Sequence, residues 1–239
     1  MTTSTSLFKY RKFDKRSIEL LVNRQLWFAK PASLNDPFEG KSSCSEVLEA
    51  VWSHYPFPEE ERKQYKTIIE TQLQNSGICS FSKTRKNQLM WSHYADEHKG
   101  ICIGFNEQIL RPDNSSIYPI DVTYQAEYPF AGIIERFKYF EELPGVNNTK
   151  SIAGDIFYSV LGTKYLNWEY ERERRLVYQK SQAISFTEKA VNSIFFGLKM
   201  PERDRLTLRK LLSGEEWQHI KWYQAIKSKT EYALVFQEI

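Results

Sequence analysis

Three short clusters in this sequence combine acidic, basic and aromatic side chains at spacings that could support chemistry. The first is the segment 35–40, NDPFEG, a few residues after Trp27. Asn35 and Asp36 before a proline predict a tight turn, because proline keeps the preceding residue out of the helical region. Such a turn would present Asp36 and Glu39 beside an aromatic wall that suits a flat ring. The simpler alternative is a turn that only caps a helix.

The second cluster is the segment 90–98, MWSHYADEH. A helix that binds a metal through two histidines places them four residues apart, whereas His93 and His98 are five apart and would lie about 140° from each other. No shared metal is therefore expected. His93 and Glu97 have the i, i+4 spacing that allows contact and would raise the imidazole pKa. The alternative is that Trp91 packs inward and His93 is a satisfied, semi-buried residue.

The third cluster is the segment 168–177, WEYERERRLV. If the segment is extended, Glu169, Glu171, Glu173 and Arg175 share one face. Two neighbouring carboxylates repel, so one pKa should rise unless Arg175 neutralises the pair. This arrangement suits a general base or a carboxylate that holds a ribose hydroxyl. The alternative is a solvated ladder of salt bridges, which contributes little to stability.

The composition excludes several classes of protein. The 239 residues contain 33 Lys and Arg against 30 Asp and Glu, a net charge of +3, with 41% hydrophobic residues. The chain is therefore neither disordered nor a strongly basic nucleic-acid protein. Three cysteines without a C-x-x-C motif argue against a disulfide framework and a structural zinc site. No apolar run reaches the roughly 20 residues of a membrane span, so we expect no membrane partner and a cytoplasmic location.

Aromatic residues make up 15% of the chain, and several lie directly beside the polar clusters. We interpret these as the walls of one polar pocket. They are Tyr10, Trp27, Trp91, Tyr94, Trp168 and Tyr170.

Helices and strands alternate irregularly along the chain. Strands are expected at 7–11, 25–30, 77–82, 101–105, 117–124, 174–179 and 193–198, with a hairpin of 219–225 and 231–236. Helices are expected after Asp14 and at 45–54, 58–74, 87–97, 130–142, 151–164 and 201–212. This order predicts one α+β domain over residues 1–239, with a central sheet that is mostly antiparallel or split and is flanked by helices. The helices at about 45–75 would form an insertion.

Residues from nearly the whole chain resemble a bacterial and phage family known as domain of unknown function 2971. The matching segments are LFKYR at 7–11, WF at 27–28, NDPFE at 35–39, SFS at 80–82, LMWSHYA at 89–95, HKGICIGF at 98–105, VTY at 122–124, and, late in the chain, Lys164, Trp168, Tyr170, Glu171, Glu173, Arg175, Leu176 and 194–197. The resemblance implies a relationship to this family, for which no reaction is established.

The order of the clusters is also similar to the pattern of the ADP-ribosyltransferase superfamily. In that pattern a polar residue lies on an early strand, a serine or aromatic residue on a middle strand, and a Glu-x-Glu strand comes late. The similarity implies an enzyme, a toxin or phage-defence effector, that takes NAD as donor and needs no metal. The catalytic residues would be Glu171, Glu173 and His93. The residues that hold the dinucleotide would be Tyr10, Arg11, Trp27, Asn35, Asp36, Trp91 and Arg175. The similarity does not identify a macromolecular acceptor.

Two other classes of function remain open at this stage. A metal-dependent nuclease or hydrolase could gather carboxylates around a divalent ion; its candidates are Asp36, Glu39, His93, Glu171 and Glu173. A binding module without chemistry could stack nucleic-acid bases on the mixed basic and aromatic segments 10–13 and 221–223.

Overall fold

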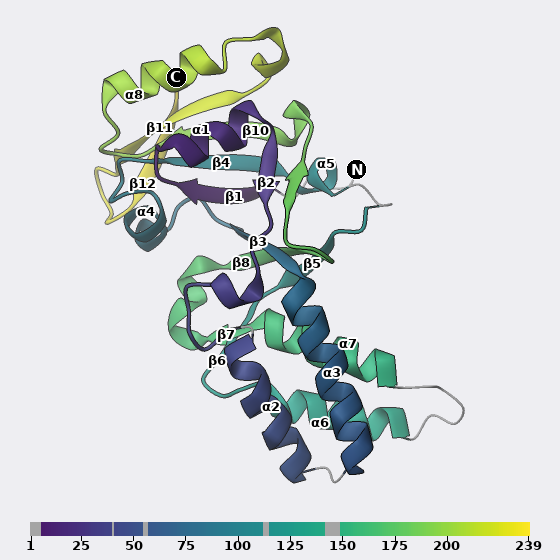
Figure 1. The fold of residues 1–239 in the computed structure, drawn as a ribbon. Coiled ribbons are helices and arrows are strands. Elements are labelled where there is room, and N and C mark those ends of the chain that lie inside the picture. The colour runs from purple at the N-terminus through teal and green to yellow at the C-terminus, as the bar shows by residue number, and fades with distance from the viewer. Residues whose placement is uncertain (1–5, 40, 55–56, 112–114, 142–148) are drawn as a thin grey trace.

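The computed structural model describes residues 6–39, 41–54, 57–111, 115–141 and 149–239. Its main sheet has eight strands in the order β12-β11-β10-β4-β1-β3-β8-β5, and the β10–β11 pair is parallel whereas every other pair is antiparallel (Figure 1). The strands are β1 (Ser6–Arg11), β3 (Gly77–Ser82), β4 (Ile101–Asn106), β5 (Tyr118–Asp121), β8 (Glu173–Tyr178), β10 (Val191–Phe196), β11 (Lys221–Lys227) and β12 (Leu234–Glu238). Two short pairs lie outside it: β2 (Gln25–Trp27) with β9 (Ala183–Ser185), and β6 (Thr123–Gln125) with β7 (Thr163–Tyr165). The α+β class and the mostly antiparallel sheet are as predicted.

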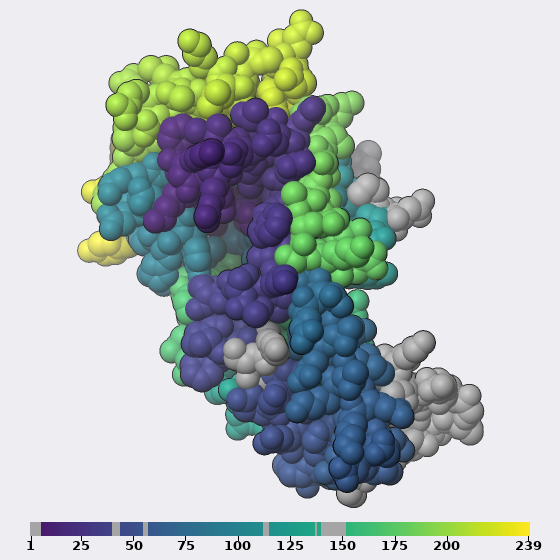
Figure 2. Space-filling view, viewed as in Figure 1, coloured from purple at the N-terminus to yellow at the C-terminus, as the bar shows by residue number. Residues whose placement is uncertain are grey.

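The helices fall into two groups. In Figure 1, α2, α3, α6 and α7 form a layered bundle at one end of the molecule, while α1, α4, α5 and α8 lie around the sheet. Their bounds are α1 (Lys15–Val22), α2 (Lys41–His54), α3 (Glu59–Asn75), α4 (Gln88–Tyr94), α5 (Glu107–Leu110), α6 (Phe130–Glu141), α7 (Thr149–Gly162) and α8 (Glu202–Leu211). The helices near 45–75 thus pack against a second helical pair from residues 130–162. Figure 2 shows the resulting elongated shape, with the purple N-terminal residues over the sheet and blue α3 at the far end.

The sheet has an apolar core on each face, because side chains alternate along each strand. On one face, Ile103 of β4 belongs to a core with Leu21 of α1 and Leu208 of α8. On the other face, Phe195 of β10 belongs to a core with Trp91 of α4. The helical bundle has a third core of its own. None of the described helices is long and apolar enough to cross a membrane.

The sheet divides between β1 and β3. All six residues of β1 pair with β4, whereas β1 and β3 share the single pair Phe8 and Ser82. The two strands separate from this point, and β3 runs toward the helical bundle (Figure 1). We call this opening the fork. It leaves room between two strands that a regular ladder would close.

Several predicted boundaries were wrong for identifiable reasons. The strand predicted at 117–124 is two strands, because the chain changes its partner strand. Residues 118–121 pair with β8, and Val122 still donates its N–H to the Glu173 carbonyl at 3.1 Å, whereas residues 123–125 pair with β7. Residues Leu166–Glu171 form a 3-10 helix instead of extended chain, so Glu169 shares no strand face with Glu173. Helix α7 ends at Gly162, two residues before Lys164. Trp27 is the last residue of β2 rather than the middle of a longer strand.

The helix predicted through Glu97 ends at Tyr94. Asp96, Glu97 and His98 all have positive φ, which is the left-handed region and cannot continue an α-helix. Glu97 instead forms a surface pair with Lys99, 3.2 Å away. The i, i+4 geometry expected for His93 and Glu97 is therefore absent.

We predict that Gly197→Ala lowers the free energy of unfolding by about 1–3 kcal/mol. A Cβ at Gly197 would lie 2.2 Å from the His98 carbonyl oxygen and 2.9 Å from that of Gly100, and backbone atoms cannot move away cheaply. The control is Gly132→Ala on α6, where a Cβ meets nothing within 4 Å. That variant should gain about 0.5–1 kcal/mol from helix propensity. Urea titration measures both, and equal stabilities for the two variants would contradict the packing described here.

Candidate functional site

A cluster of five buried charged residues lies next to the fork. We call it the charge cluster; its members are Glu39, Lys164, Glu171, Glu173 and Arg175. The ammonium of Lys164 lies 2.7 Å from Glu171 Oε2, 3.0 Å from Glu39 Oε1 and 3.6 Å from Glu173 Oε2. It therefore joins the carboxylate of Glu39, in an early turn, to those of Glu171 and Glu173, which are two residues apart late in the chain.

Arg175 is the second cation of the charge cluster and is almost completely buried. Its Nε and Nη2 atoms donate to the two oxygens of Glu173, each at 2.9 Å. Nη2 also donates to Glu39, and Nη1 donates to the Leu161 carbonyl at 2.6 Å. Such a two-pronged bond fixes the geometry as well as the charge.

The local sequence explains how each carboxylate reaches the cluster. On β8, Glu173 and Arg175 are two residues apart and so share one face. In the predicted turn, Asp36 Oδ1 accepts from the N–H of Phe38 at 2.9 Å, and the N–H of Glu39 donates to the Asp36 carbonyl at 3.2 Å. This local bonding reverses the chain and directs Glu39 inward.

The pKa values of Glu173 and Glu39 are shifted in opposite directions. Burial alone would raise the pKa of Glu173, but Arg175 and Lys164 outweigh it and lower this pKa to about 2. For Glu39 burial prevails over the same two cations, and its pKa is raised. Three carboxylates against two cations leave one negative charge when all are ionised. The charge cluster therefore favours either a proton on Glu39 or a nearby positive charge.

Glu171 is held at both oxygens. Lys164 donates to Oε2, and the Tyr94 hydroxyl donates to Oε1 at 2.6 Å. The Tyr94 oxygen in turn accepts from Asn35 Nδ2 at 3.2 Å. Burial, followed by this bond to Glu171, raises the pKa of Tyr94, so the phenol stays protonated and remains a donor. The carboxylate of Glu171 is thus fixed in one orientation.

A cavity of about 200 Å³ opens at the fork, directly against the charge cluster. Its lining comes from β1, the 34–39 turn, β3, α4 and the segments around Lys164 and β8. The lining residues are Phe8, Lys9, Tyr10, Arg11, Leu34, Asn35, Glu39, Ser80, Phe81, Ser82, Met90, Tyr94, Lys164, Glu171, Glu173 and Arg175. The Arg11 guanidinium donates through Nε to Ser17 Oγ at 3.1 Å.

The structure brings together six of the residues that sequence reasoning selected. Tyr10, Arg11, Asn35, Glu171, Glu173 and Arg175 all line the cavity at the fork.

The other four selected residues lie outside this cavity. Trp27 is 62% exposed at the end of β2. Asp36 is buried in the turn. Trp91 is fully buried, with its ring against Tyr10. His93 is exposed, and its Nδ1 lies 3.1 Å from the Tyr170 hydroxyl, one residue away from Glu171.

The residues that sequence reasoning left out are mainly supporting ones. Lys164 had no local signal beyond being a lysine close to an apolar helix. Glu39 was considered as a carboxylate beside an aromatic wall and as a metal ligand, and Tyr94 as part of an aromatic wall. Ser82 was not selected, although its hydroxyl donates to the Glu171 carbonyl at 2.6 Å. Each of these roles depends on tertiary pairing.

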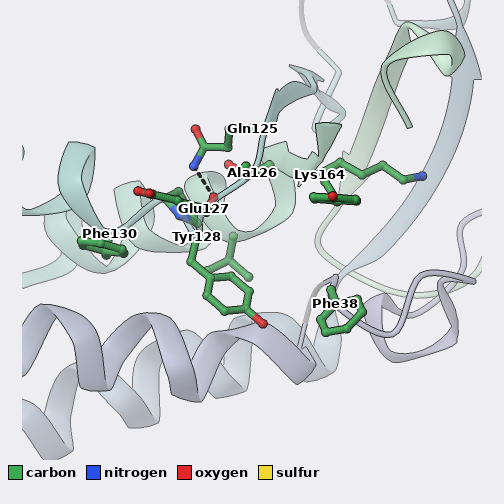
Figure 3. Close-up of a pocket in the computed structure, with 11 residues that line it drawn as sticks. Phe38, Gln125, Ala126, Glu127, Tyr128, Phe130 and Lys164 are labelled. Carbon is green, nitrogen blue, oxygen red and sulfur yellow. Dashed lines mark hydrogen bonds between the residues drawn. The ribbon is translucent and has the colours of Figure 1, made fainter. Parts of the chain in front are cut away.

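A larger cavity of about 490 Å³ lies on the other side of Lys164 (Figure 3). Phe38, Tyr128 and Phe130 line it, and its surface is largely apolar. In Figure 3 the ammonium of Lys164 points away from these rings, and it lies 2.7 Å from Glu171 Oε2 of the charge cluster. Within the described ranges, no three His, Cys, Asp or Glu side chains are grouped so as to hold a metal ion.

These features define an α+β protein with a buried, charged site at a divided sheet. Residues 90–176 match a family described as "Protein of unknown function (DUF2971)". The matched stretch carries Tyr94, Lys164, Glu171, Glu173 and Arg175, and it supports the resemblance to that family. Comparison with curated proteins gave no match, and comparison with solved structures gave none either.

We predict that Glu173→Gln lowers the free energy of unfolding by about 3–5 kcal/mol, because it leaves Arg175 buried without its main counter-charge. The matched control is Glu97→Gln, which removes the same charge from a fully exposed surface pair and should change little. Urea titration at neutral pH measures both, and equal effects would contradict the structural role of the charge cluster.

The pH dependence of stability gives a second test of the charge cluster. The pKa of Glu173 is depressed in the folded state, so its contribution is present above the ordinary value of 4.5 and is lost as the pH falls toward about 2. Glu39, whose pKa is raised by burial, is present in both the wild type and Glu173→Gln and so does not produce the difference between their slopes. Stability of the wild type should therefore fall from pH 4.5 to 2 more steeply than that of Glu173→Gln. Parallel slopes in urea titrations would contradict this assignment.

Proposed function

We propose that the protein is an enzyme that breaks the bond between nicotinamide and ribose in NAD and transfers the ADP-ribosyl group. The observation that carries the proposal is the juxtaposition at the fork of an oriented carboxylate, Glu171, with a net negative charge cluster and an open cavity. Arg11 on β1, Ser82 on β3 and Glu173 on β8 come in the chain order of the superfamily pattern, whereas Glu171 lies in the 3-10 helix just before β8.

The charge of the cavity suits this donor. The nicotinamide ring of NAD is positively charged, and the ribosyl carbon gains oxocarbenium character as the ring leaves. The fixed carboxylate of Glu171, which lines the cavity, stabilises both, while Arg11 in the same lining can face the phosphates of the donor. A preorganised carboxylate acts most strongly where water is scarce, because it needs no reorganisation during the reaction.

Separate roles follow from the contacts of each residue. Glu171 would face the reacting ribose, since Tyr94 and Lys164 hold its two oxygens in place. Glu173 would act indirectly, because both of its oxygens accept from Arg175. Arg11 lines the cavity with its Nη atoms not engaged by any described residue, so it can bind a phosphate of the donor.

The reaction is balanced within the donor and acceptor. The C1′–N bond of the nicotinamide ribose breaks, and its electron pair neutralises the pyridinium nitrogen. Nicotinamide leaves as a neutral molecule. A nucleophilic oxygen or nitrogen of the acceptor, or water, forms the new bond to C1′ and releases its proton to the solvent. Glu171 would hold the ribose hydroxyl and stabilise the positive charge while both bonds are weak.

The contacts favour this function over metal-dependent hydrolysis. A divalent ion needs several free carboxylate oxygens. In the charge cluster, Lys164 and Arg175 already pair with the oxygens of Glu39, Glu171 and Glu173. A metal would have to displace these buried cations.

We predict that the purified protein releases nicotinamide from NAD and that Glu171→Gln reduces the rate by about 100-fold or more, the scale expected for losing a main electrostatic group. Tyr94→Phe should reduce it less, because Lys164 still holds Glu171. Chromatography of the products measures release. Urea titration of each variant shows whether the fold is retained.

The control for this experiment is Glu97→Gln, which removes a surface carboxylate on the same segment as Tyr94. It should keep the wild-type rate. Two results would contradict the proposal. One is that the wild type releases no nicotinamide, either with water or with cell extract as a source of acceptors. The other is full activity in a folded Glu171→Gln variant.

A further inference from the structure

A second site is centred on Arg85, which follows β3. The Arg85 guanidinium lies over three aromatic rings, 5.5 Å from the centre of Phe8, 5.1 Å from that of Phe195 and 5.8 Å from that of Phe236. No oxygen of the described residues accepts a hydrogen bond from it, and its Nε is buried without a partner. Arg85 is thus a partly buried cation without a counter-ion in the described part of the chain.

A partly buried cation without a counter-ion is costly. Aromatic faces attract a guanidinium but do not accept its several directed N–H bonds. Removing those donors from water without replacing the bonds opposes folding. An anion in front of the guanidinium would accept these N–H bonds and offset the cost. Arg85, unpaired among the described residues, therefore indicates a binding site for an anionic ligand.

A cavity of about 380 Å³ lies beside Arg85 on the face of the sheet. Its lining is polar and aromatic and contains no carboxylate. The lining residues are Ser6, Phe8, Arg85, Asn192, Ser193, Phe195, His219, Lys221 and Tyr223. Lys221 and Tyr223 come from a segment that the sequence had suggested for nucleic-acid binding. Glu238, on the neighbouring strand β12, is paired across from Tyr223.

The polar groups of this cavity are arranged to leave donors for a ligand. Ser193 Oγ donates to Asn192 Oδ1 at 2.7 Å, and Asn192 Nδ2 donates to Ser6 Oγ at 3.3 Å. The Ser6 hydroxyl is therefore free to donate its proton into the cavity. His219 is held by Nε2, which donates to the Val191 carbonyl at 2.9 Å. Lys221 is exposed and forms no ion pair with a described residue.

Glycine keeps the inner wall of this cavity open. A Cβ at Gly104 on β4 would lie 2.2 Å from Ser193 Oγ and 2.7 Å from Asn192 Oδ1. A larger residue would displace both of these polar groups. Gly104 therefore lets Ser193 and Asn192, which line the cavity together with Arg85 and Lys221, lie close to β4.

We propose that this second site binds a phosphate group, either as free inorganic phosphate or as the phosphate of a nucleotide. Two cations without a carboxylate, together with hydroxyl donors, match the charge and the several acceptor oxygens of phosphate. The aromatic walls leave room for a flat base beside the phosphate. The site is independent of the proposed chemistry, although Phe8 lines both cavities.

The test is calorimetric titration of the full-length protein with inorganic phosphate, with AMP and with adenosine. Phosphate or AMP should bind, and adenosine should bind at least tenfold more weakly than AMP. Tighter binding of AMP than of phosphate identifies a nucleotide as the ligand, and the reverse identifies the free anion.

Two variants locate the binding. Arg85→Gln should weaken it at least tenfold, and Lys221→Gln, which alters only an exposed side chain, should weaken it severalfold while the fold is kept. The matched control is Lys210→Gln, which removes the same charge from the exposed surface of α8 and should leave the affinity unchanged. No heat of binding with phosphate or AMP, equal affinity for adenosine and AMP, or equal affinities of wild type and Lys221→Gln would each overturn the proposal. Nicotinamide release by Lys221→Gln should be unchanged, which separates this test from that of the proposed function.

Discussion

The buried pairing of Glu173 with Arg175 is the interaction on which the site depends. Arg175 also donates to Glu39 in an early turn and to the carbonyl of Leu161 at the end of α7. Lys164 then joins the same carboxylates to Glu171. Removing one charge leaves the others buried and uncompensated, so the cost is far larger than for a surface pair. The charge cluster thereby ties the helical bundle, the turn and the strand β8 into one arrangement.

The fork gives this charge cluster access to a ligand. A complete ladder between β1 and β3 would cover the carboxylates with backbone, whereas the single pair of Phe8 with Ser82 leaves an opening. The divided sheet brings Arg11 on β1 to the same cavity as Glu171, which lies just before β8. The fold and the site are therefore linked. The strands β1 and β3 separate where a ligand can reach the buried carboxylates, and the charge cluster holds the part of the sheet beyond the fork, β3, β8 and β5, in place.

Sequence reasoning succeeded where local rules decide the structure. Alternation placed Glu173 and Arg175 on one face, and proline chemistry gave the turn that directs Glu39. It failed where distant contacts override local preference. The segment from Asp96 to His98 takes left-handed backbone that no periodicity indicates, and so the predicted approach of His93 to Glu97 is absent. Lys164 is among the residues of the family resemblance, but no local pattern indicates its role, because that role exists only once three carboxylates surround it.

The two cavities differ in the charged groups that line them. At the fork, the carboxylates of Glu39, Glu171 and Glu173 lie among four basic residues, Lys9, Arg11, Lys164 and Arg175. At the second site, Arg85 and Lys221 line a cavity without any carboxylate. Neither set of charges can be read from the net charge of +3, because each depends on which side chains the fold brings together at a cavity. The ring of Phe8 lies in the lining of both cavities, so a single strand, β1, borders one site that contains three carboxylates and one that contains none. A partly buried charge without a partner is thus a more specific guide to ligand chemistry than the composition of the chain.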